Sequence, residues 1–140
     1  MLHLEHVNLV VNDLPAALAF YQTAFPHWQV RASGDGEWYG KPRRWLHFGD
    51  DFQYLAFNDH GEGENRDLEG HQVGLAHFAF VTDSIDALIR RMTDAGYAIA
   101  SDGVKEPWRR NVYFIDPAGF EVEFVQYLSD VPQERNLSSE

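Results

Sequence analysis

The chain contains no cysteine and no long run of apolar residues. Without cysteine, its 140 residues can form no disulfide, no thiolate zinc site and no cysteine nucleophile, and this absence favours a reducing compartment. No stretch reaches the roughly 18 consecutive apolar residues of a membrane-spanning helix, and the N-terminus lacks a basic segment followed by an apolar one. We therefore expect a cytoplasmic protein that does not bind a membrane.

Positive charge is also scarce. The sequence has 11 Lys and Arg residues against 22 Asp and Glu residues, a formal net charge of −11 with the histidines neutral. Such a balance argues against a nucleic acid or an anionic lipid surface as the partner. A phosphate-binding glycine loop and a serine–histidine–aspartate arrangement are missing as well, so we expect a small-molecule substrate.

The clearest pattern that is present is an internal repeat at an offset of 71 residues. Leu4-Glu5-His6-Val7-Asn8-Leu9 corresponds to Leu75-Ala76-His77-Phe78-Ala79-Phe80, and an apolar helical pattern follows in register in both copies. Two copies of one strand-then-helix unit are therefore predicted. Copies that close on a pseudo-two-fold axis bring equivalent side chains together, which makes a metal site at the two histidines conceivable.

Helix boundaries are marked in both copies. In the first, Asp13 and Pro15 suit the first turn of a helix that ends before Pro26. In the second, a helix capped by Asp83 or Ser84 ends at Gly96. Each copy therefore predicts a strand, a helix and further strands.

The predicted strands and helices make up one domain of the α+β class. The strands lie at residues 6–11, 29–33, 36–39, 45–48 and 52–57 in the first copy, and at 75–81, 97–100, 112–115 and 120–127 in the second. The domain covers residues 1–128, with module one at about 1–58, a polar connection at 59–70 and module two at about 71–128. The polar tail at 129–140 is expected to fray.

Strand alternation divides the side chains between two faces of each predicted sheet. One face is apolar and is expected to pack on the helices. The opposite face is polar and predicts a concave, ligand-holding side. Its predicted members are His6, Asn8, Gln53, His77, Ala79, Tyr113, Glu121 and Glu123.

Three segments resemble the vicinal oxygen chelate superfamily, which includes glyoxalase I, extradiol dioxygenases, fosfomycin-resistance enzymes and bleomycin-binding proteins. They are His6-Val7-Asn8-Leu9-Val10-Val11, His77-Phe78-Ala79-Phe80-Val81 and the run Tyr113-Phe114-Ile115-Asp116-Pro117-Ala118-Gly119-Phe120-Glu121-Val122-Glu123-Phe124-Val125-Gln126. The resemblance covers about residues 4–126. It implies two βαβββ modules in tandem whose mixed sheets form a cup around a divalent metal, and it implies a homodimer in which modules can be exchanged between subunits.

The resemblance also implies the ligand set. His6, Gln53, His77 and Glu123 fall at the metal-ligand positions of the superfamily, with Gln53 as the weakest donor. Two imidazoles and a carboxylate suit one Ni, Zn, Mn, Co or Fe ion per site and leave positions open for substrate. Glu121 shares the predicted face of Glu123 and is the candidate general base, so Glu121 and Glu123 are the candidate catalytic carboxylates.

Simpler roles stay open for several of these residues. The repeat-related histidines could be ordinary half-buried side chains, Gln53 a hydrogen-bonding residue and Glu121 a salt-bridge partner. His47 is interpreted as an ordinary strand residue rather than a cup residue, and the remaining histidines as surface residues. Those histidines are His3, His27, His60 and His71.

Further side chains could shape a ligand site. The aromatic candidates for an apolar pocket are Trp38, Tyr39, Trp45, Trp108 and Tyr113. The pairs Arg43-Arg44 and Arg109-Arg110 either clamp a carboxylate or phosphate or are solvated.

Three functions remain open on the sequence alone. The preferred hypothesis is a metal-dependent glyoxalase-like lyase or isomerase that acts on a small substrate with vicinal oxygens through an enediolate-type intermediate. The second is a non-haem Fe(II) extradiol-type dioxygenase, since His6, His77 and Glu123 match a two-histidine, one-carboxylate triad. The third is a metal-free protein that binds a drug or metabolite.

Overall fold

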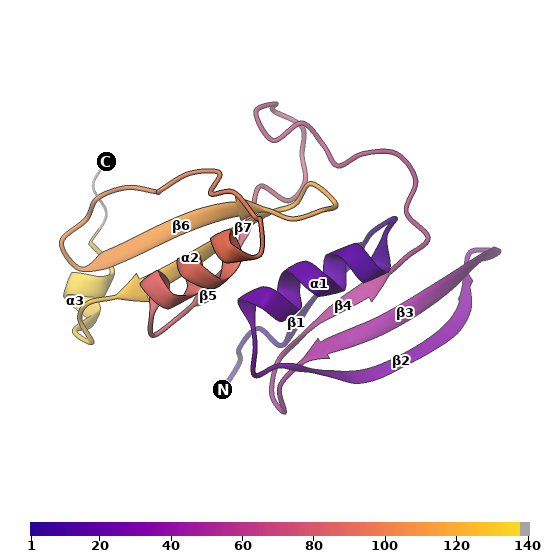
Figure 1. The fold of residues 1–140 in the computed structure, drawn as a ribbon, viewed down its shortest axis with the longest axis horizontal. Helices are drawn as coiled ribbons and strands as arrows, with labels where there is room; N and C mark the ends of the chain where they lie inside the picture. Colours follow the sequence, from indigo (N-terminus) through magenta and orange to yellow (C-terminus); the bar gives the residue numbers. More distant parts are fainter. Residues whose placement is uncertain (138–140) are drawn as a thin grey trace. The chain divides into compact units, whose positions relative to one another are not determined.

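The computed structural model describes residues 1–137 and divides the chain into two compact units, Met1–Glu64 and Asn65–Glu140. Each unit contains one sheet with a helix packed against it (Figure 1). The division between the units falls inside the polar connection expected at 59–70. Among the described residues, no helix is both long and apolar enough to span a membrane.

The first unit has the strand, helix and three strands that the family resemblance implies. These are β1 (His6–Val10), α1 (Leu14–Ala24), β2 (Gln29–Trp38), β3 (Lys41–Gly49) and β4 (Tyr54–Asn58). The sheet order is β1-β4-β3-β2, in which β1 runs parallel to β4 and the other pairs are antiparallel.

Strand β2 is longer than the sequence predicts. The two short strands expected at 29–33 and 36–39 form one continuous strand of ten residues, interrupted only by an irregularity between Val30 and Ala32. Tyr39 and Gly40 turn the chain into β3 with φ values of 43° and 85°. Two successive positive φ angles are typical of the tight hairpin turn that matches the twist of its strands, so β2 and β3 form one long ribbon.

Helix α1 begins and ends where the sequence predicts. The Asp13 side chain accepts a hydrogen bond from the backbone N–H of Ala16 at 3.0 Å, and Pro15 lies in the first turn. Its buried face carries Phe20 and Tyr21, and the Tyr21 ring lies 5.4 Å from that of Phe57 on β4. Burial of each such side chain stabilises the unit by about 1.5–3 kcal/mol.

The second unit has one strand fewer than predicted. Its elements are β5 (Phe78–Val81), α2 (Ile85–Asp94), β6 (Arg109–Ile115), β7 (Glu121–Tyr127) and α3 (Pro132–Arg135), with the sheet order β5-β7-β6. The strand expected at 97–100 is not formed. The chain there meets β6 in an isolated bridge between Ser101 and Tyr113, and the backbone N–H of Ala100 donates to the carbonyl oxygen of Tyr113 at 2.9 Å. Gly103 follows two residues later with φ at +72°.

The remaining boundaries of the second unit follow the sequence. Ser84 caps α2, accepting from the N–H of Ala87, and Gly96 follows the helix with φ at +94°. The tail that was expected to fray instead contains α3, and the Arg135 guanidinium lies 4.0 Å from the centre of the Tyr127 ring. Residues 138–140 of that tail lie outside the described residues.

Both sheets have one face toward their helix and one open face, by which we mean the face opposite the helix. On the helix side lie the fully buried Phe48 and Phe57 in the first unit, and Phe114 and Phe124 in the second. The strand pairings place other side chains together on the open faces, where the candidate site residues are found.

Candidate functional site

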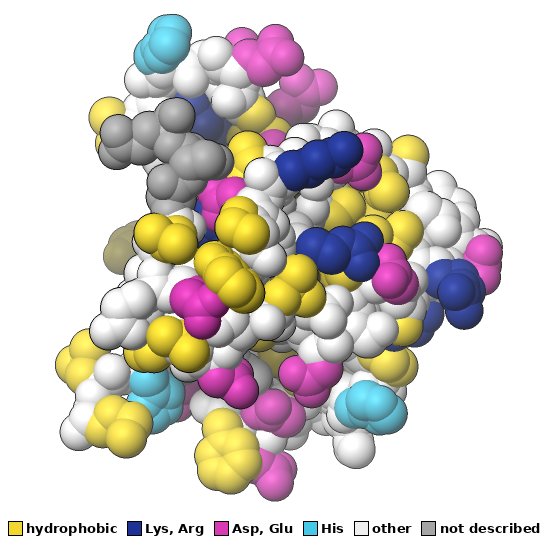
Figure 2. Space-filling model, turned by 90° about the vertical axis from the view of Figure 1, so that its left-hand side faces the viewer, with side chains coloured by type: hydrophobic (Ala, Val, Ile, Leu, Met, Phe, Trp, Pro, Cys, Tyr) yellow, Lys and Arg dark blue, Asp and Glu magenta, His cyan; other side chains and the backbone are white. Residues whose placement is uncertain are grey.

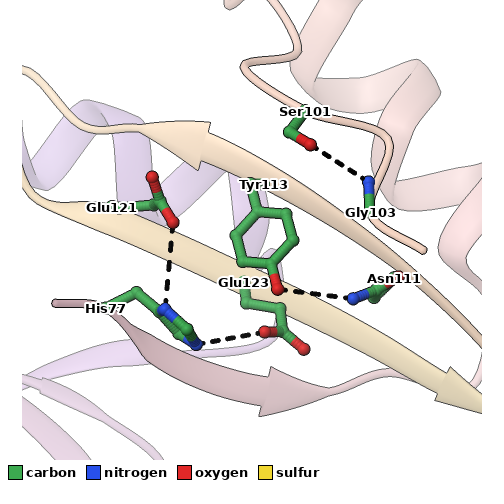
Figure 3. Close-up of polar contacts among 7 residues, drawn as sticks. All are labelled: His77, Ser101, Gly103, Asn111, Tyr113, Glu121 and Glu123. Atoms are coloured by element: carbon green, nitrogen blue, oxygen red, sulfur yellow. Dashed lines mark hydrogen bonds and ion pairs between the residues drawn. The ribbon is translucent and has the colours of Figure 1, made fainter. Parts of the chain in front are cut away.

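The open face of the second unit collects polar side chains from three neighbouring strand positions. Glu123 on β7 pairs with Ala79 of β5 on one side and with Tyr113 of β6 on the other. His77 precedes β5 by one residue, and its side chain points toward Glu123 (Figure 3). The sheet therefore brings together His77, Tyr113, Glu121 and Glu123, as strand alternation predicts.

A tight turn fixes the register that presents the two glutamates. Asp116 is 3% exposed, and its Oδ1 accepts from the N–H groups of Ala118 and Phe120, both at 2.9 Å. Gly119 has a φ of +90°, a left-handed backbone conformation that glycine adopts more readily than residues with a side chain. Strand β7 starts directly after this turn. Glu121 and Glu123 are two residues apart in it, so they point to the same face.

His77 lies between two carboxylates, one at each ring nitrogen. Its Nε2 is 3.2 Å from Glu123 Oε2, and its Nδ1 is 3.8 Å from Glu121 Oε1 (Figure 3). Ionised carboxylates only accept hydrogen bonds, and a neutral imidazole has a single N–H. A neutral ring therefore donates to at most one of the two carboxylates, and the 3.8 Å separation from Glu121 is longer than a hydrogen bond.

Tyr113 and Asn111 extend this cluster along β6. Burial raises the pKa of Tyr113 to about 12, helped by its hydrogen bond to Glu123 and by the negative charges of Glu123 and Glu121. The Tyr113 hydroxyl thus stays protonated and accepts from Asn111 Nδ2 at 3.5 Å. Asn111 is 6% exposed, and its Oδ1 has no hydrogen-bond partner among the described residues.

The second-unit donors fit a divalent metal in chemistry and in spacing. Neighbouring ligands bound at about 2.0–2.2 Å to an octahedral or tetrahedral ion are about 2.8–3.6 Å apart, and His77 Nε2 and Glu123 Oε2 are 3.2 Å apart. An outer carboxylate on Nδ1, the place of Glu121, is the usual partner of a metal-binding histidine. Within residues 1–137, however, no three His, Asp or Glu side chains form a complete metal-binding group.

In the first unit His6 is held by a similar contact. Its Nδ1 is 2.8 Å from Glu5 Oε1. The carboxylate is the acceptor, so Nδ1 carries a proton, and in the neutral form of the ring Nε2 then has the free lone pair. Its ring stacks on Tyr54 at 4.6 Å. Both repeat-related histidines thus have a carboxylate at Nδ1.

His47 belongs to the same open face, contrary to its interpretation as an ordinary strand residue. It pairs with Ala56, and its ring stacks on the Tyr54 ring, with the two ring centres 4.6 Å apart. Burial lowers the pKa of His47, and the positive charges of His6 and Arg31 lower it further. Its place on this face follows from the antiparallel register of β3 with β4.

Gln53 lies outside β4, in the turn that precedes it. Asp50 Oδ1 accepts from the Gln53 backbone N–H at 2.9 Å, and Gln53 Nε2 lies 3.5 Å from Asp50 Oδ2. These bonds, with one from the Phe52 N–H, lower the pKa of Asp50. The register pairs His6 with Tyr54, so Tyr54 has the place beside His6 that strand alternation assigned to Gln53.

His6 and Gln53 belong to the first unit, and His77, Glu121 and Glu123 to the second. The convergence of His6 with His77 and Glu123 therefore stays a prediction. Of the histidines interpreted as surface residues, His3, His27 and His71 are exposed. That interpretation is wrong for His60, which is half-buried, has a buried Nδ1 and stacks on Trp38 at 5.4 Å.

Comparison with known families gives one match over most of the chain. The family model described as Glyoxalase/Bleomycin resistance protein/Dioxygenase superfamily matches residues 3–124. Comparison with curated protein sequences gives no match.

Solved structures with the same fold come from several bacteria. A glyoxylase/bleomycin resistance protein/dioxygenase domain from Frankia sp. EAN1pec is 20% identical with a TM-score of 0.75, covering 98% of this chain and 99% of that one. A glyoxalase family protein from Bacillus cereus is 16% identical with a TM-score of 0.74, covering 92% and 96%. The fosfomycin resistance protein FosX from Listeria monocytogenes, complexed with Mn(II) and sulfate, is 23% identical with a TM-score of 0.64, covering 96% and 98%.

Proposed function

We propose, on the premise that this chain belongs to the Glyoxalase/Bleomycin resistance protein/Dioxygenase superfamily, that it is a metal-dependent lyase or isomerase of the glyoxalase type. Its substrate is a small molecule with vicinal oxygens, in which a proton moves at a carbon next to a carbonyl. The observation that carries the proposal is the position of His77, with Glu123 at Nε2 and Glu121 at Nδ1.

The proposed metal ligands are His77 and Glu123 from the second unit and His6 from the first. His6 supports this role because Glu5 engages its Nδ1 and leaves Nε2 for the ion. Gln53 stays the predicted fourth and weakest ligand. Members of this superfamily bind divalent metals, and the similar FosX was obtained with Mn(II), which supports a divalent metal from the candidates Ni, Zn, Mn, Co and Fe.

A bound divalent ion would polarise the carbonyl of the substrate and acidify the neighbouring C–H. Glu121 is the proposed base that takes this proton. Its side chain is 28% exposed, whereas that of Glu123 is 11% exposed, so Glu121 is the more accessible of the two carboxylates to a substrate. Because its pKa is raised to about 12, Tyr113 stays neutral near neutral pH. Its hydroxyl donates a hydrogen bond to Glu123, which holds that carboxylate in place.

The donor set also supports a second candidate, an extradiol-type oxygenase. Two histidines and one carboxylate are the usual ligands of non-haem Fe(II) in oxygenases. This function would need Fe(II) and molecular oxygen, and it would not need Glu121 as a base.

Metal analysis of the purified protein tests the proposal first. We expect about one divalent transition metal per chain, and His77→Ala should abolish its binding without loss of the fold, since removing a ligand does not open the apolar core. His71→Ala is the matched control, because His71 is an exposed histidine of the same unit. Unchanged metal binding in a His6→Ala, His77→Ala double variant would defeat the assignment.

Two assays then separate the functions. Deuterium exchange into 2-hydroxy-carbonyl and 2-keto-acyl compounds supports the lyase or isomerase, whereas Fe(II)-dependent oxygen uptake with catechols supports the oxygenase. A protein that retains no metal and is silent in both assays would be a binding protein for a small molecule.

A homodimer is the proposed assembly. Proteins of this superfamily commonly form dimers, and the repeat described above predicts pairing of modules. Sedimentation of the purified protein at several concentrations gives its mass, and a monomer at all of them would contradict the proposal. We also propose that the protein is cytoplasmic.

A further inference from the structure

A small pocket lies on the open face of the first unit, next to the stack of His6, Tyr54 and His47. Its volume is about 260 Å³, below the range of about 300–1,000 Å³ that holds drug-sized ligands. A ligand with a single ring suits this size. The side chains that define it are Trp38, Trp45 and His47 as walls, with Arg43, Asn8 and Asn58 as polar groups.

Among the residues that line the pocket, Arg43 carries a permanent positive charge. No carboxylate among the described residues neutralises that charge. Each of the other three arginines in the pairs Arg43-Arg44 and Arg109-Arg110 has a carboxylate partner. Arg44 pairs with Asp35 at 3.5 Å, Arg109 with Glu106 at 2.6 Å and Arg110 with Asp86 at 2.9 Å. None of the ion pairs within residues 1–137 includes Arg43, although Asp and Glu side chains are spread over the face drawn in Figure 2.

Amides hold the Arg43 guanidinium instead of a carboxylate. Arg43 Nη1 donates to Asn58 Oδ1, and Asn58 Nδ2 donates to Asn8 Oδ1 at 2.6 Å. Asn58 is 3% exposed, and the buried Arg43 Nε has no hydrogen-bond partner in the described part of the chain. Amides position the cation without neutralising it, so an anion gains the full charge-assisted interaction.

One glycine on β2 makes room for the aromatic wall. Trp45 pairs with Gly34, where an added Cβ would lie 2.9 Å from the indole ring. Arg43 pairs with Gly36, and its guanidinium lies 5.6 Å from the centre of the Trp38 ring. Flat side chains around one cation are suited to a flat ligand with a negative charge.

We propose that this pocket binds a small planar acid, a one-ring carboxylate whose anionic group meets Arg43 and whose ring lies against Trp38 and Trp45. The inference rests on the proposed function only in naming the substrate class of that enzyme, since the same sheet face carries His6. The binding itself requires no metal.

Calorimetric titration of the wild-type protein, as purified and after chelation, tests the ligand class without any substitution. The probes are benzoate, its neutral analogue benzamide, and cyclohexanecarboxylate, which has the charge but no flat ring. We expect benzoate to bind best in both preparations, with benzamide weaker by about 10-fold or more, because charge-assisted hydrogen bonds are lost. Equal binding of benzoate and benzamide overturns the proposal, as does no benzoate binding up to about 10 mM.

Matched arginine variants then locate the site. Arg43→Gln should weaken benzoate binding by about 10- to 100-fold, and Arg43→Lys should recover part of it. Arg44→Gln removes an adjacent arginine that already has a carboxylate partner, so it should change the affinity less than about twofold. Equal losses in Arg43→Gln and Arg44→Gln would overturn the proposal.

The two proposals fail in different measurements. Benzoate binding that depends on Arg43 in chelated protein supports the planar-acid pocket whatever the metal analysis gives. Metal binding that depends on His77, together with no preference for benzoate over benzamide, overturns the pocket alone.

Discussion

The two open faces share a strand plan but differ in chemistry. In the second unit, carboxylates on β7 surround one histidine. In the first, the equivalent face carries indoles, imidazoles and amides around Arg43, and no carboxylate lines its pocket. One face is therefore suited to a cation and the other to an anion with a ring. A duplicated backbone can keep its hydrogen-bond register while its outward side chains change, because alternate residues of a strand are independent of the core.

The largest expected difference concerns the carboxylates at the two histidines. Glu121→Gln should lower turnover by about 10²–10⁴-fold even at saturating metal, the usual contribution of a positioned base. Glu5→Gln should instead lower metal affinity by about 10–100-fold and leave turnover at saturating metal much less affected, because Glu5 contacts only the Nδ1 of His6. Steady-state kinetics across a metal titration separates the two, and identical profiles would contradict the comparison.

A comparison of the two cores comes next in size. Phe57 and Phe124 are both fully buried, one in each unit. Replacement of either by Ala should lower the free energy of unfolding by about 3–5 kcal/mol. Hydrogen exchange resolved by segment should show the greater loss of protection in the unit that carries the change, and undiminished protection in both would contradict the burial described here.

Glycine substitutions give a smaller contrast. Gly103→Ala adds a Cβ that would collide with Asn111 Oδ1, and it places alanine at a φ of +72°. It should therefore lower the free energy of unfolding by about 1–3 kcal/mol. Gly36→Ala meets no described atom within 4 Å and should stabilise the protein by about 0.5 kcal/mol, through the lower entropy of the unfolded chain. Denaturant unfolding of both variants checks the signs, and a stabilising Gly103→Ala would contradict the first.

The smallest effects concern one exposed ion pair in each unit. Hydrogen bonds from Lys41 and Arg110 lower the pKa of Glu62 and Asp86, respectively. A carboxyl whose pKa is lower in the folded state stabilises it above the ordinary pKa and loses that contribution as the pH falls through the lowered value. Carboxyl titration by NMR should show Lys41→Gln raising only the pKa of Glu62 and Arg110→Gln only that of Asp86; a change in both would mean the pairs are not independent.

The sequence predicted most of the fold because local signals are strong where the core is formed. The helices begin at the predicted places, capped by Asp13 and by Ser84, one of the two predicted caps of the second helix, and the run from Asp116 to Glu123 forms the predicted turn and strand. The family and the α+β architecture were predicted correctly for the same reason. The strand at 97–100 was not, since its residues cannot show that this segment meets β6 only in an isolated bridge at Ser101.

The sites were less predictable because they depend on register. Alternation places residues on a face only inside a strand, and Gln53 lies one residue before β4. The place beside His6 therefore belongs to Tyr54, and His47 joins the face through its pairing with Ala56. Which of four similar arginines lacks a carboxylate partner is also a matter of long-range contacts, such as that between Arg110 and Asp86.

The parallel pairing of the first and last strands of each unit has a consequence for synthesis on the ribosome. Among the strands of residues 1–137, β1 pairs only with β4, whose last residue is Asn58, and β5 pairs only with β7, which ends at Tyr127. At about 5–20 residues per second, β1 waits several seconds for its partner after it is made. During that interval the apolar side of α1 lacks the β4 side chains that cover it, so the nascent chain offers a chaperone a target until Asn58 has emerged.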